Sequence, residues 1–324
     1  MEHVADHPRE VLVTGGCGFI GRPLVAALVR RGCRVRVLDD LSTGTPGCPP
    51  GAELTVGSVL DADTLREAAR GVDLVVHLAG VVGMRLATRE RELAHRVAAE
   101  GTRLLLRHTG EAPAVLFSSS AVYGLSDIAT PMSERQPVDR TVPLRYDGGV
   151  PGYATGKWEM EQLGLRAAHD RPVLVVRPFN VVGAGQVSRY GMVVPSFAER
   201  ALAGGTLTVH GDGRQTRCFS DVDEFVRLVL RLIDTPRAWE PGGAVVNVGT
   251  AARTSVLELA ELVVRTVGRG DIRFRPYEEA FPGRTDVRHR VPDVSRLAEL
   301  AGPSRWPSIE EVVGATVNRL APTG

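Results

Sequence analysis

Tyr153 and Lys157 are four residues apart in the segment YATGKWEMEQLGL, whose apolar spacing predicts a helix. Residues at this spacing share one face of a helix. A lysine ammonium beside a phenol favours the phenolate and lowers the pKa of the tyrosine, which then suits proton transfer to and from a hydroxyl group. One of the three serines at residues 118–120, which end a predicted apolar strand, could hold or relay the same proton. The three side chains could therefore act together as an acid–base group.

The segment GGCGFIG at residues 15–21 is a second place where residue type and spacing point to chemistry. It follows a predicted strand, Val11–Thr14, and precedes a stretch of helical character. Gly15 can make the tight turn, Gly18 lets the backbone approach a pyrophosphate, and Gly21 lets the helix pack against the strand. The helix N-terminus then faces the negative charge. This order of elements predicts a dinucleotide-binding turn.

Asp39 ends the next predicted strand, about 20 residues downstream of the glycines, where an acid receives the ribose hydroxyls of a dinucleotide. Its carboxylate would repel the extra phosphate of NADP, whereas an arginine at that place would attract it. The sequence therefore predicts NAD as the cofactor.

The elements that must position these residues follow from the hydrophobic pattern of the first half. Short β-branched runs alternate with longer amphipathic stretches, which is typical of a parallel sheet covered by helices on both faces. The expected fold class is α/β, a Rossmann-type doubly wound parallel sheet with a smaller mixed α/β substrate-binding lobe. We expect strands at Val11–Thr14, Arg34–Asp39, Leu54–Val56, Leu74–Leu78, Ala114–Ser118 and Val173–Arg177, and helices that begin near Phe19, Asp61, Glu90 and Tyr153.

The pattern becomes rich in loops near Asn180, and this change sets the expected domain boundary. Residues 1–179 are expected to form the NAD-binding Rossmann domain with the candidate Ser/Tyr/Lys group. Residues 180–324 are expected to form mainly the substrate-binding lobe, with some segments returning to the main sheet. The lobe segments are predicted at Leu207–His210, Val222–Ile233, Val245–Val248, Val256–Val267 and Ile309–Arg319.

Composition limits the classes of partner. Hydrophobic residues make up 43% of the 324 residues and the formal net charge is +1, so neither nucleic acid nor an anionic membrane is an expected partner. The N-terminal MEHVADHPRE lacks the apolar run of a signal peptide, no later stretch approaches membrane-spanning length, and a cytoplasmic location is expected. The four cysteines are far apart, without a CxxC or Cys/His cluster, so we expect reduced thiols and no metal site.

Taken together, these motifs resemble the extended short-chain dehydrogenase/reductase superfamily, in its sugar-nucleotide epimerase/dehydratase branch. The resemblance spans nearly the whole chain. The residues that carry it are TGGCGFIG at 14–21, DDLSTG at 39–44, HLAG at 77–80, SSSAVYG at 118–124, YATGK at 153–157, RPFNVVG at 177–183, GMVVPSF at 191–197, GDGRQTRCF at 211–219, NVG at 247–249 and GRTDVRHRVPD at 283–293.

The resemblance implies roles for particular residues. Ser119 matches the catalytic Ser/Thr position, Tyr153 matches the acid/base, and Lys157 would tune the tyrosine and hold the nicotinamide ribose. The implied cofactor-binding residues are Gly15, Gly18, Phe19, Ile20, Gly21, Asp39, Ser42, Thr43, Gly44, Ser58, Val59, Leu78, Ala79, Tyr153, Lys157 and Pro178. The implied substrate-binding residues are Ser119, Ser120, Asn180, Val194, Arg217, Arg284 and Arg290. A homodimer and a nucleotide-sugar substrate, UDP-linked, are also expected from the family.

Asn180, Arg217 and Arg284 match the family's contacts to the substrate diphosphate, and the planar fork of arginine suits phosphate oxygens. Arg290, in the segment RVPD, looks like the arginine that meets the sugar carboxylate in UDP-glucuronate decarboxylases. An acidic sugar is therefore one of the expected substrates.

The two positions that directly follow Ser119, residues 120 and 121, distinguish the activities of this branch. The 4,6-dehydratases carry Asp and Glu directly after the catalytic Ser/Thr, and here those positions are Ser120 and Ala121. Alanine cannot act as acid or base, which argues against 4,6-dehydration. UDP-glucuronate decarboxylases usually keep a Glu at the position of Ala121, so this departure conflicts with the hint from Arg290.

The function that survives every departure is 4-epimerisation of a nucleotide sugar, a UDP-hexose or UDP-hexuronate, through a transient 4-keto sugar. It needs only Ser119, Tyr153, Lys157 and a ketosugar that can rotate. UDP-glucuronate decarboxylation is the first alternative, because it uses the same oxidation at C4. A 4,6-dehydratase and a non-catalytic NAD-binding protein are further alternatives.

Overall fold

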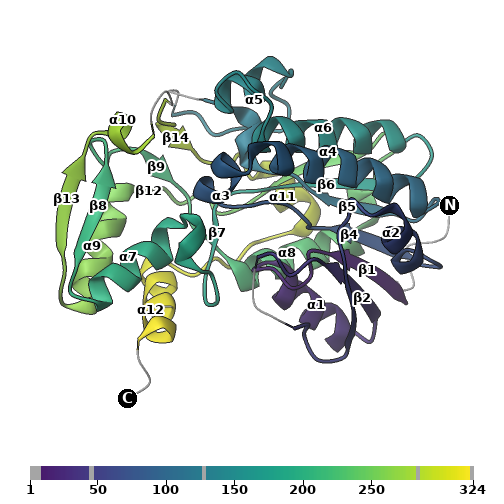
Figure 1. The fold of residues 1–324 in the computed structure, drawn as a ribbon, viewed down its shortest axis with the longest axis horizontal. Coiled ribbons are helices and arrows are strands. Elements are labelled where there is room, and N and C mark those ends of the chain that lie inside the picture. Colours follow the sequence, from purple (N-terminus) through teal and green to yellow (C-terminus); the bar gives the residue numbers. More distant parts are fainter. Residues whose placement is uncertain (1–8, 44–46, 126–128, 282–284, 322–324) are drawn as a thin grey trace.

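A seven-stranded parallel sheet forms the centre of the larger part of the molecule (Figure 1). The computed structural model describes residues 9–43, 47–125, 129–281 and 285–321. The strand order is β11-β6-β5-β4-β1-β2-β3, which is the order of a doubly wound Rossmann sheet and confirms the expected fold class. The strands are β1 (Glu10–Thr14), β2 (Arg34–Asp39), β3 (Ala52–Val56), β4 (Leu74–His77), β5 (Ala114–Phe117), β6 (Val173–Pro178) and β11 (Ala244–Val248).

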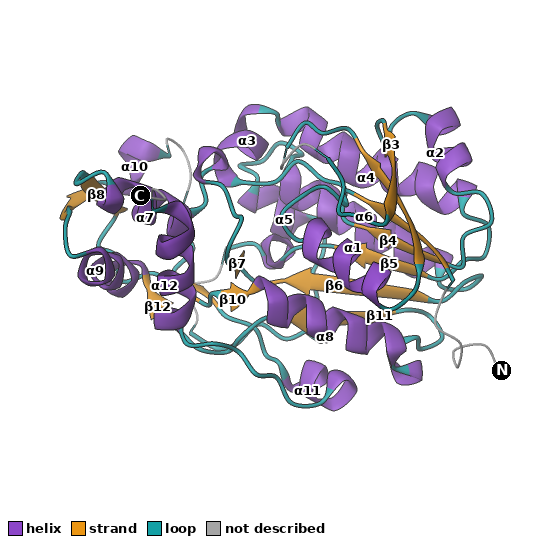
Figure 2. Ribbon diagram, turned by 90° about the horizontal axis from the view of Figure 1, so that it is seen from below, coloured by secondary structure: helices purple, strands orange, loops and turns teal. Residues whose placement is uncertain are grey.

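Helices cover both faces of this sheet (Figure 2). One apolar core joins the sheet to α1 (Gly21–Arg30), α8 (Val222–Asp234) and α11 (Ser295–Ala301). A second core joins the opposite face to α2 (Ala62–Ala68), α4 (Arg91–His108) and α6 (Tyr153–Ala167). Burial on both faces explains why the central strands read as continuous apolar runs rather than as alternating patterns.

Two segments beyond residue 180 that were expected in the smaller lobe belong to the main sheet. The sequence placed Val222–Ile233 and Val245–Val248 in the lobe, but α8 packs against the sheet and β11 pairs in parallel with β6. The correction has a simple physical reason. An amphipathic helix or a short apolar strand shows that one face is buried, but its own residues do not say which sheet buries it.

The smaller lobe has an apolar core of its own. Its helices are α7 (Val193–Leu202), α9 (Val256–Val267), α10 (Tyr277–Ala280) and α12 (Ile309–Leu320). Its strand pairs are β8 (Thr206–His210) with β13 (Asp271–Arg275), and β9 (Thr216–Arg217) with both β12 (Thr254–Ser255) and β14 (His289–Arg290). Between the two parts, β7 (Val181–Val182) pairs with β10 (Ser220–Asp221).

Two short helices that the sequence did not predict are α3 (Met84–Arg89) and α5 (Thr141–Tyr146). Short 3-10 turns occupy Ser120–Tyr123, Ser188–Tyr190 and Pro236–Ala238. Among the residues that the structure describes, no helix has the length and apolar character needed to span a membrane.

Candidate active site

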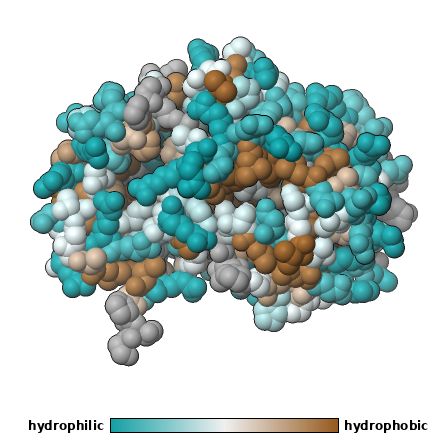
Figure 3. All heavy atoms as spheres, in the orientation of Figure 1, coloured by the Kyte–Doolittle hydropathy of each residue, from teal (hydrophilic) through white to brown (hydrophobic). Residues whose placement is uncertain are grey.

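A cavity of about 650 Å³ lies at the carboxyl ends of the sheet strands and extends to the smaller lobe. Its wall includes the glycine turn after β1, the end of β5, and Arg217 and Arg290 from the lobe. On the face that Figure 3 shows, hydrophobic residues gather near α3 and α4 and again near α1. Ligands of doubly wound sheets bind in this position, so the cavity is the candidate active site.

The glycine turn is built for close backbone packing. Gly15 has a φ of 73°, and a Cβ there would lie 2.7 Å from the amide nitrogen of Ala79. A Cβ at Gly21 would collide with the carbonyl oxygen of Gly15. No side chain caps the N-terminus of α1 and no acid lies in its first turn, which leaves the positive end of the helix available to an anion.

Asp39 lies at the end of β2 and is connected to the glycine turn. Its carboxylate accepts hydrogen bonds from the backbone N–H of Cys17 at 2.8 Å and of Leu41 at 2.9 Å. Burial raises the pKa of Asp39, and these two hydrogen bonds lower it in part. The carboxylate therefore holds the turn in shape as well as lining the cavity.

Ser119 and Tyr153 both line the cavity. Ser119 follows β5, and its hydroxyl accepts a hydrogen bond from the N–H of Ala121 at 3.1 Å. Tyr153 is the first residue of α6. Burial raises the pKa of Tyr153, while a hydrogen bond with Ser119 and the charge of Arg290 lower it. The two hydroxyl groups are therefore neighbours at the wall of one cavity.

Lys157 is on α6 with Tyr153 but is not among the residues that line the cavity. Its side chain is buried, with 2% of the residue exposed, and its Nζ donates a hydrogen bond to the carbonyl oxygen of Phe117 at 2.7 Å. Burial lowers the pKa of Lys157 to about 8, against a raising influence from Glu161. We expected the lysine to lower the pKa of Tyr153, but burial dominates that phenol and raises its pKa.

A buried polar network that the sequence did not reveal lies beneath the candidate residues. Glu161, one turn after Lys157 on α6, accepts a hydrogen bond from Ser118 at 2.5 Å and two from Arg177 at 2.8 and 2.6 Å. Arg177 also lies over the ring of Tyr123, with 4.7 Å from Cζ to the ring centroid. The network connects α6 to β6 and to the residue that follows β5.

Arg217 and Arg290 lie side by side, because they are register partners on the adjacent parallel strands β9 and β14. Arg217 donates to the carbonyl oxygen of Val287 at 2.7 Å and lies 3.5 Å from Asp286. Burial lowers the pKa of Arg217, and the charge of Arg290 lowers it further. Two neighbouring cations in one cavity wall form a site suited to an anion.

The other predicted residues divide into three groups. Those that line the cavity are Gly18, Phe19, Ile20, Ser42, Thr43, Ser58, Val59, Leu78, Ala79, Ser120, Pro178 and Asn180, along with Gly15, Gly21 and Asp39. Val194 is not brought to the cavity: its side chain is buried in the core of the smaller lobe. Gly44 and Arg284 lie outside the described residues.

Sequence reasoning also missed Tyr146 and Asp147, which line the cavity. The carboxylate of Asp147 accepts hydrogen bonds from the N–H groups of Ala154 at 3.2 Å and Thr155 at 2.8 Å, and from the hydroxyl of Thr155 at 2.7 Å. Asp147 therefore caps the N-terminus of α6, although it lies seven residues before Ala154 in the sequence. The residue directly before Tyr153 is Gly152, which has no side chain that could cap the helix.

The sheet order, the glycine turn with Asp39, and the Ser119–Tyr153 contact define a dinucleotide-binding fold with an acid–base pair at its cavity. The chain belongs to the NAD dependent epimerase/dehydratase family, which it matches over residues 11–249. Its cofactor is NAD. The turn fits this group, because the glycine backbone is exposed to the cavity beside a helix N-terminus and a buried carboxylate.

Relatives of this chain carry out different reactions. It is 31% identical to a UDP-N-acetyl-alpha-D-glucosaminuronate decarboxylase of Bacillus cytotoxicus, over 90% of this chain and 91% of the relative. A UDP-glucose 4-epimerase of Thermotoga maritima with UDP-glucose is similar in structure, with a TM-score of 0.83, 27% identity and coverage of 96% and 98%. MoeE5 in complex with UDP-glucuronic acid and NAD has a TM-score of 0.80, 27% identity and coverage of 95% and 98%. The family is shared, but its members' activities differ.

Proposed function

We propose that this protein is a nucleotide-sugar 4-epimerase that acts on a UDP-hexose or UDP-hexuronate through a transient 4-keto sugar. The family and the NAD cofactor are common to epimerases and decarboxylases, so the proposal depends on the groups in the cavity. The observation that carries it is the pair Ser119 and Tyr153 without a carboxylate at positions 120 and 121.

In this mechanism Tyr153, as phenolate, takes the proton of the C4 hydroxyl, and Ser119 holds the same oxygen by its hydroxyl. NAD, which the glycine turn and Asp39 would hold, would supply the acceptor and later the donor of the C4 hydride. The sugar becomes a 4-ketone, turns over within the cavity and regains hydrogen on its other face. Tyr153 then returns the proton to the C4 oxygen. Lys157 stabilises the phenolate by its charge and through its place on α6.

The surroundings of Tyr153 support epimerisation over 4,6-dehydration. A dehydratase needs an acid and a base to move protons around the elimination. Here Ala121 is buried at the cavity wall, and Ser120 offers only a hydroxyl. The charge of Asp147 raises the pKa of Tyr153, but the carboxylate oxygens of Asp147 accept the hydrogen bonds that cap α6.

UDP-glucuronate decarboxylation is the second candidate, and Arg290 is the observation that favours it. Arg290 is a buried cation near Tyr153, in the place where a carboxylated sugar would need a partner. Loss of CO₂ from a 4-keto uronic acid requires no base once C4 is oxidised. The relative from B. cytotoxicus is itself a decarboxylase of an acidic UDP-sugar.

Incubation of the purified enzyme with UDP-glucose, UDP-N-acetylglucosamine and UDP-glucuronate separates these functions. We expect a product of unchanged mass with inverted C4, identified by mass spectrometry and NMR. Clean formation of UDP-xylose and CO₂ from UDP-glucuronate would establish the decarboxylase instead. No product and no transient absorbance of reduced NAD with any of the three substrates would favour a non-catalytic NAD-binding protein.

We also propose a cytoplasmic homodimer that associates through helices such as α6, following the resemblance to the family. Sedimentation equilibrium of the full chain at micromolar concentration tests the oligomeric part. A mass equal to 34.8 kDa at all concentrations would reject it.

A further inference from the structure

Arg290 is a buried cation that lacks an anionic partner among the described residues. It is 5% exposed, and none of the ion pairs in the described part of the chain includes it. Its Nη2 donates to the carbonyl oxygen of Gly124 at 2.6 Å, while its Nε is buried without a hydrogen-bond partner. Burying an unpaired charge and an unpaired donor is costly, so this guanidinium is suited to an anionic ligand.

Arg290 and Gly124 are 166 residues apart in the sequence. Backbone pairing brings the segment that carries Arg290 to the candidate active site. Met132 and Pro292 form a parallel bridge, with the N–H of Met132 donating to Val291 and the N–H of Asp293 donating to Met132, both at 2.8 Å. This fixed backbone sets where the Arg290 side chain starts. It does not set how the planar guanidinium is turned.

The ring of Tyr146 limits how the guanidinium plane of Arg290 can be oriented. The Cζ atom of Arg290 lies over the Tyr146 ring, 4.9 Å from the ring centroid. Tyr146 is the last residue of α5, which is packed so closely on Gly124 that a Cβ there would lie 2.6 Å from Val142. The ring and the carbonyl that hold the guanidinium are thus parts of one packed unit.

We propose that Tyr146 is a positioning residue that turns the Arg290 guanidinium toward a carboxylate on the reacting sugar, so that this cavity selects a UDP-hexuronate over a neutral UDP-hexose. The inference deepens the proposed function by naming the substrate class, and it rests on Tyr153 as the group that meets the C4 hydroxyl.

The place of Arg290 relative to Tyr153 favours a sugar carboxylate over the diphosphate as the anion. Arg290, Tyr146 and Tyr153 line the same cavity, and the charge of Arg290 lowers the pKa of the Tyr153 phenol. In a hexuronate the carboxylate is attached to C5, the neighbour of C4, so it must lie close to whichever residue meets the C4 hydroxyl. Arg217, the neighbouring cation, has Asp286 at 3.5 Å and remains available to the diphosphate side.

The test compares Tyr146→Leu with Tyr146→Phe in the NAD-loaded enzyme. Leucine removes the ring under the guanidinium, whereas phenylalanine keeps the ring and its attraction for a cation. Titration calorimetry with UDP-glucuronate and UDP-glucose measures binding independently of turnover. We expect Tyr146→Leu to weaken UDP-glucuronate about tenfold and to leave UDP-glucose within twofold, and Tyr146→Phe to stay within twofold for both.

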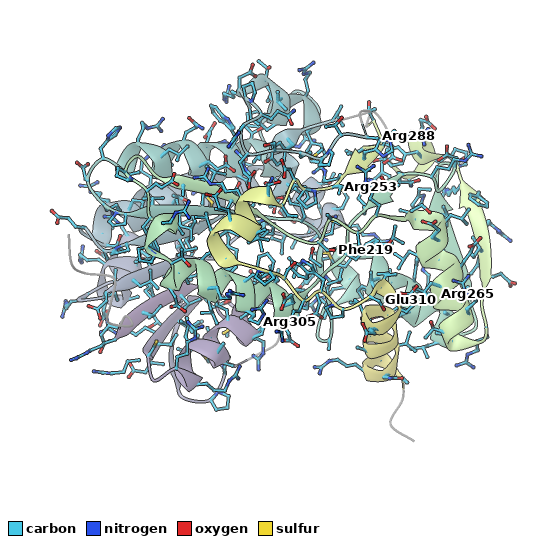
Figure 4. The ribbon with its side chains drawn as sticks, turned by 180° about the vertical axis from the view of Figure 1, so that it is seen from behind. Phe219, Arg253, Arg265, Arg288, Arg305 and Glu310 are labelled. Atoms are coloured by element: carbon cyan, nitrogen blue, oxygen red, sulfur yellow. The ribbon has the colours of Figure 1, made fainter. Side chains whose placement is uncertain are left out.

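A matched surface control is Arg265→Ala on the smaller lobe, where Figure 4 labels Arg265 on α9. This variant should change neither affinity. Equal weakening of both substrates by Tyr146→Leu would show that Arg290 reads the diphosphate, and would overturn the proposal. Unchanged UDP-glucuronate affinity in Tyr146→Leu would overturn it as well.

A double-mutant cycle keeps the test decisive if Tyr146→Leu lowers stability. Arg290→Lys keeps a charge but removes the planar fork, so the ring should have little left to orient. We expect Tyr146→Leu to cost UDP-glucuronate affinity in the wild-type background and less than twofold in the Arg290→Lys background. Equal losses in both backgrounds would show that Tyr146 acts independently of Arg290.

Failure of this inference and failure of the proposed function give different results. Loss of CO₂ from UDP-glucuronate in the wild type would replace the epimerase but leave carboxylate selection by Tyr146 and Arg290 standing. Epimerisation of UDP-glucose with no stronger binding of UDP-glucuronate would keep the epimerase and reject carboxylate selection.

Discussion

Tyr153 is subject to opposing influences that set how readily it becomes a phenolate. Burial raises its pKa, and Tyr146 and Asp147 raise it further, whereas Ser119 and Arg290 lower it. In the absence of ligands the neutral phenol is therefore favoured. When NAD and the sugar are bound, proton transfer from the sugar hydroxyl must rely on positive charges around the site. Lys157 and Arg290 are the charges that this chain supplies.

Replacing Tyr153 by phenylalanine should remove the acid–base group and keep the ring. We expect turnover to fall by roughly a hundredfold or more, the scale for loss of a positioned acid/base. NAD affinity, measured by fluorescence titration, should change little. Turnover close to that of the wild type would reject the role proposed for Tyr153.

Asp39 combines two tasks, because its carboxylate anchors the N–H of Cys17 and faces the cavity. Asp39→Asn removes the charge and keeps a side chain that can accept one of these hydrogen bonds. We expect NAD affinity to fall about tenfold and the ratio of NADP to NAD affinity to rise, since the repulsion of the extra phosphate is lost.

The neighbouring Asp40→Asn provides the control for the Asp39 prediction. Asp40 is exposed, and its carboxylate accepts hydrogen bonds from Ser42. Titration of both variants with both cofactors makes the comparison. An unchanged cofactor ratio in Asp39→Asn would show that Asp39 only supports the turn.

Lys157 should make the stability of the protein depend on pH in a definite direction. Its pKa falls from 10.5 to about 8 on folding, so between these pH values the unfolded chain holds a proton that the native chain has lost. Stability therefore rises with pH across this window. At about 1.36 kcal/mol per pH unit the full gain is roughly 3 kcal/mol.

The Lys157→Met variant has no titrating group at this position. Comparing it with the wild type therefore separates the effect of Lys157 on stability from the effects of the other groups that titrate. From urea unfolding at pH 7.5 and 9.5, we expect the difference in unfolding free energy between wild type and variant to shift by about 2 kcal/mol in favour of the wild type. A constant difference would mean that the buried lysine keeps its proton.

At the scale of the elements, α6 is held at its first turn and near its middle by polar contacts with other segments. Asp147 caps its first turn, and Glu161 joins it to Ser118 on one side and Arg177 on the other. These contacts fix Tyr153 relative to the end of β5, where Ser119 lies. The relative position of Ser119 and Tyr153 therefore depends on the contacts that hold α6 against the end of β5.

Glu161→Leu should be much more destabilising than a surface substitution, because it leaves the Arg177 charge buried without a partner. Removing one partner of a buried ion pair costs about 3–5 kcal/mol. We expect the double variant Glu161→Leu with Arg177→Met to recover a large part of this loss in thermal and urea unfolding. Additive losses in the double variant would show that the two residues act independently.

At the scale of the whole molecule, the larger part is assembled from segments on both sides of residue 179. The edge strand β11 and the helices α8 and α11 complete the sheet and one of its cores. The smaller lobe then supplies Arg217 and Arg290 to the same cavity. The chain must fold nearly complete before both walls of the cavity exist.

A fragment of residues 1–179 should therefore not be a folded NAD-binding domain. It would expose the edge of β6 and the apolar face that α8 covers. Circular dichroism, urea unfolding and NAD titration of the fragment beside the full chain make the comparison. A cooperative transition together with NAD binding in the fragment would contradict this view.

The sequence by itself determined the local features: the parallel strands, the glycine turn with Asp39, and the helix that begins at Tyr153. These depend on periodicity and on short motifs, which a few neighbouring residues encode. The tertiary structure alone decided that α8 and β11 join the main sheet, that Val194 lies in a core, and that Glu161 pairs with Arg177. It also brought Tyr146 beneath Arg290. Such contacts join residues far apart in the chain, and their side chains carry no local pattern that names the partner.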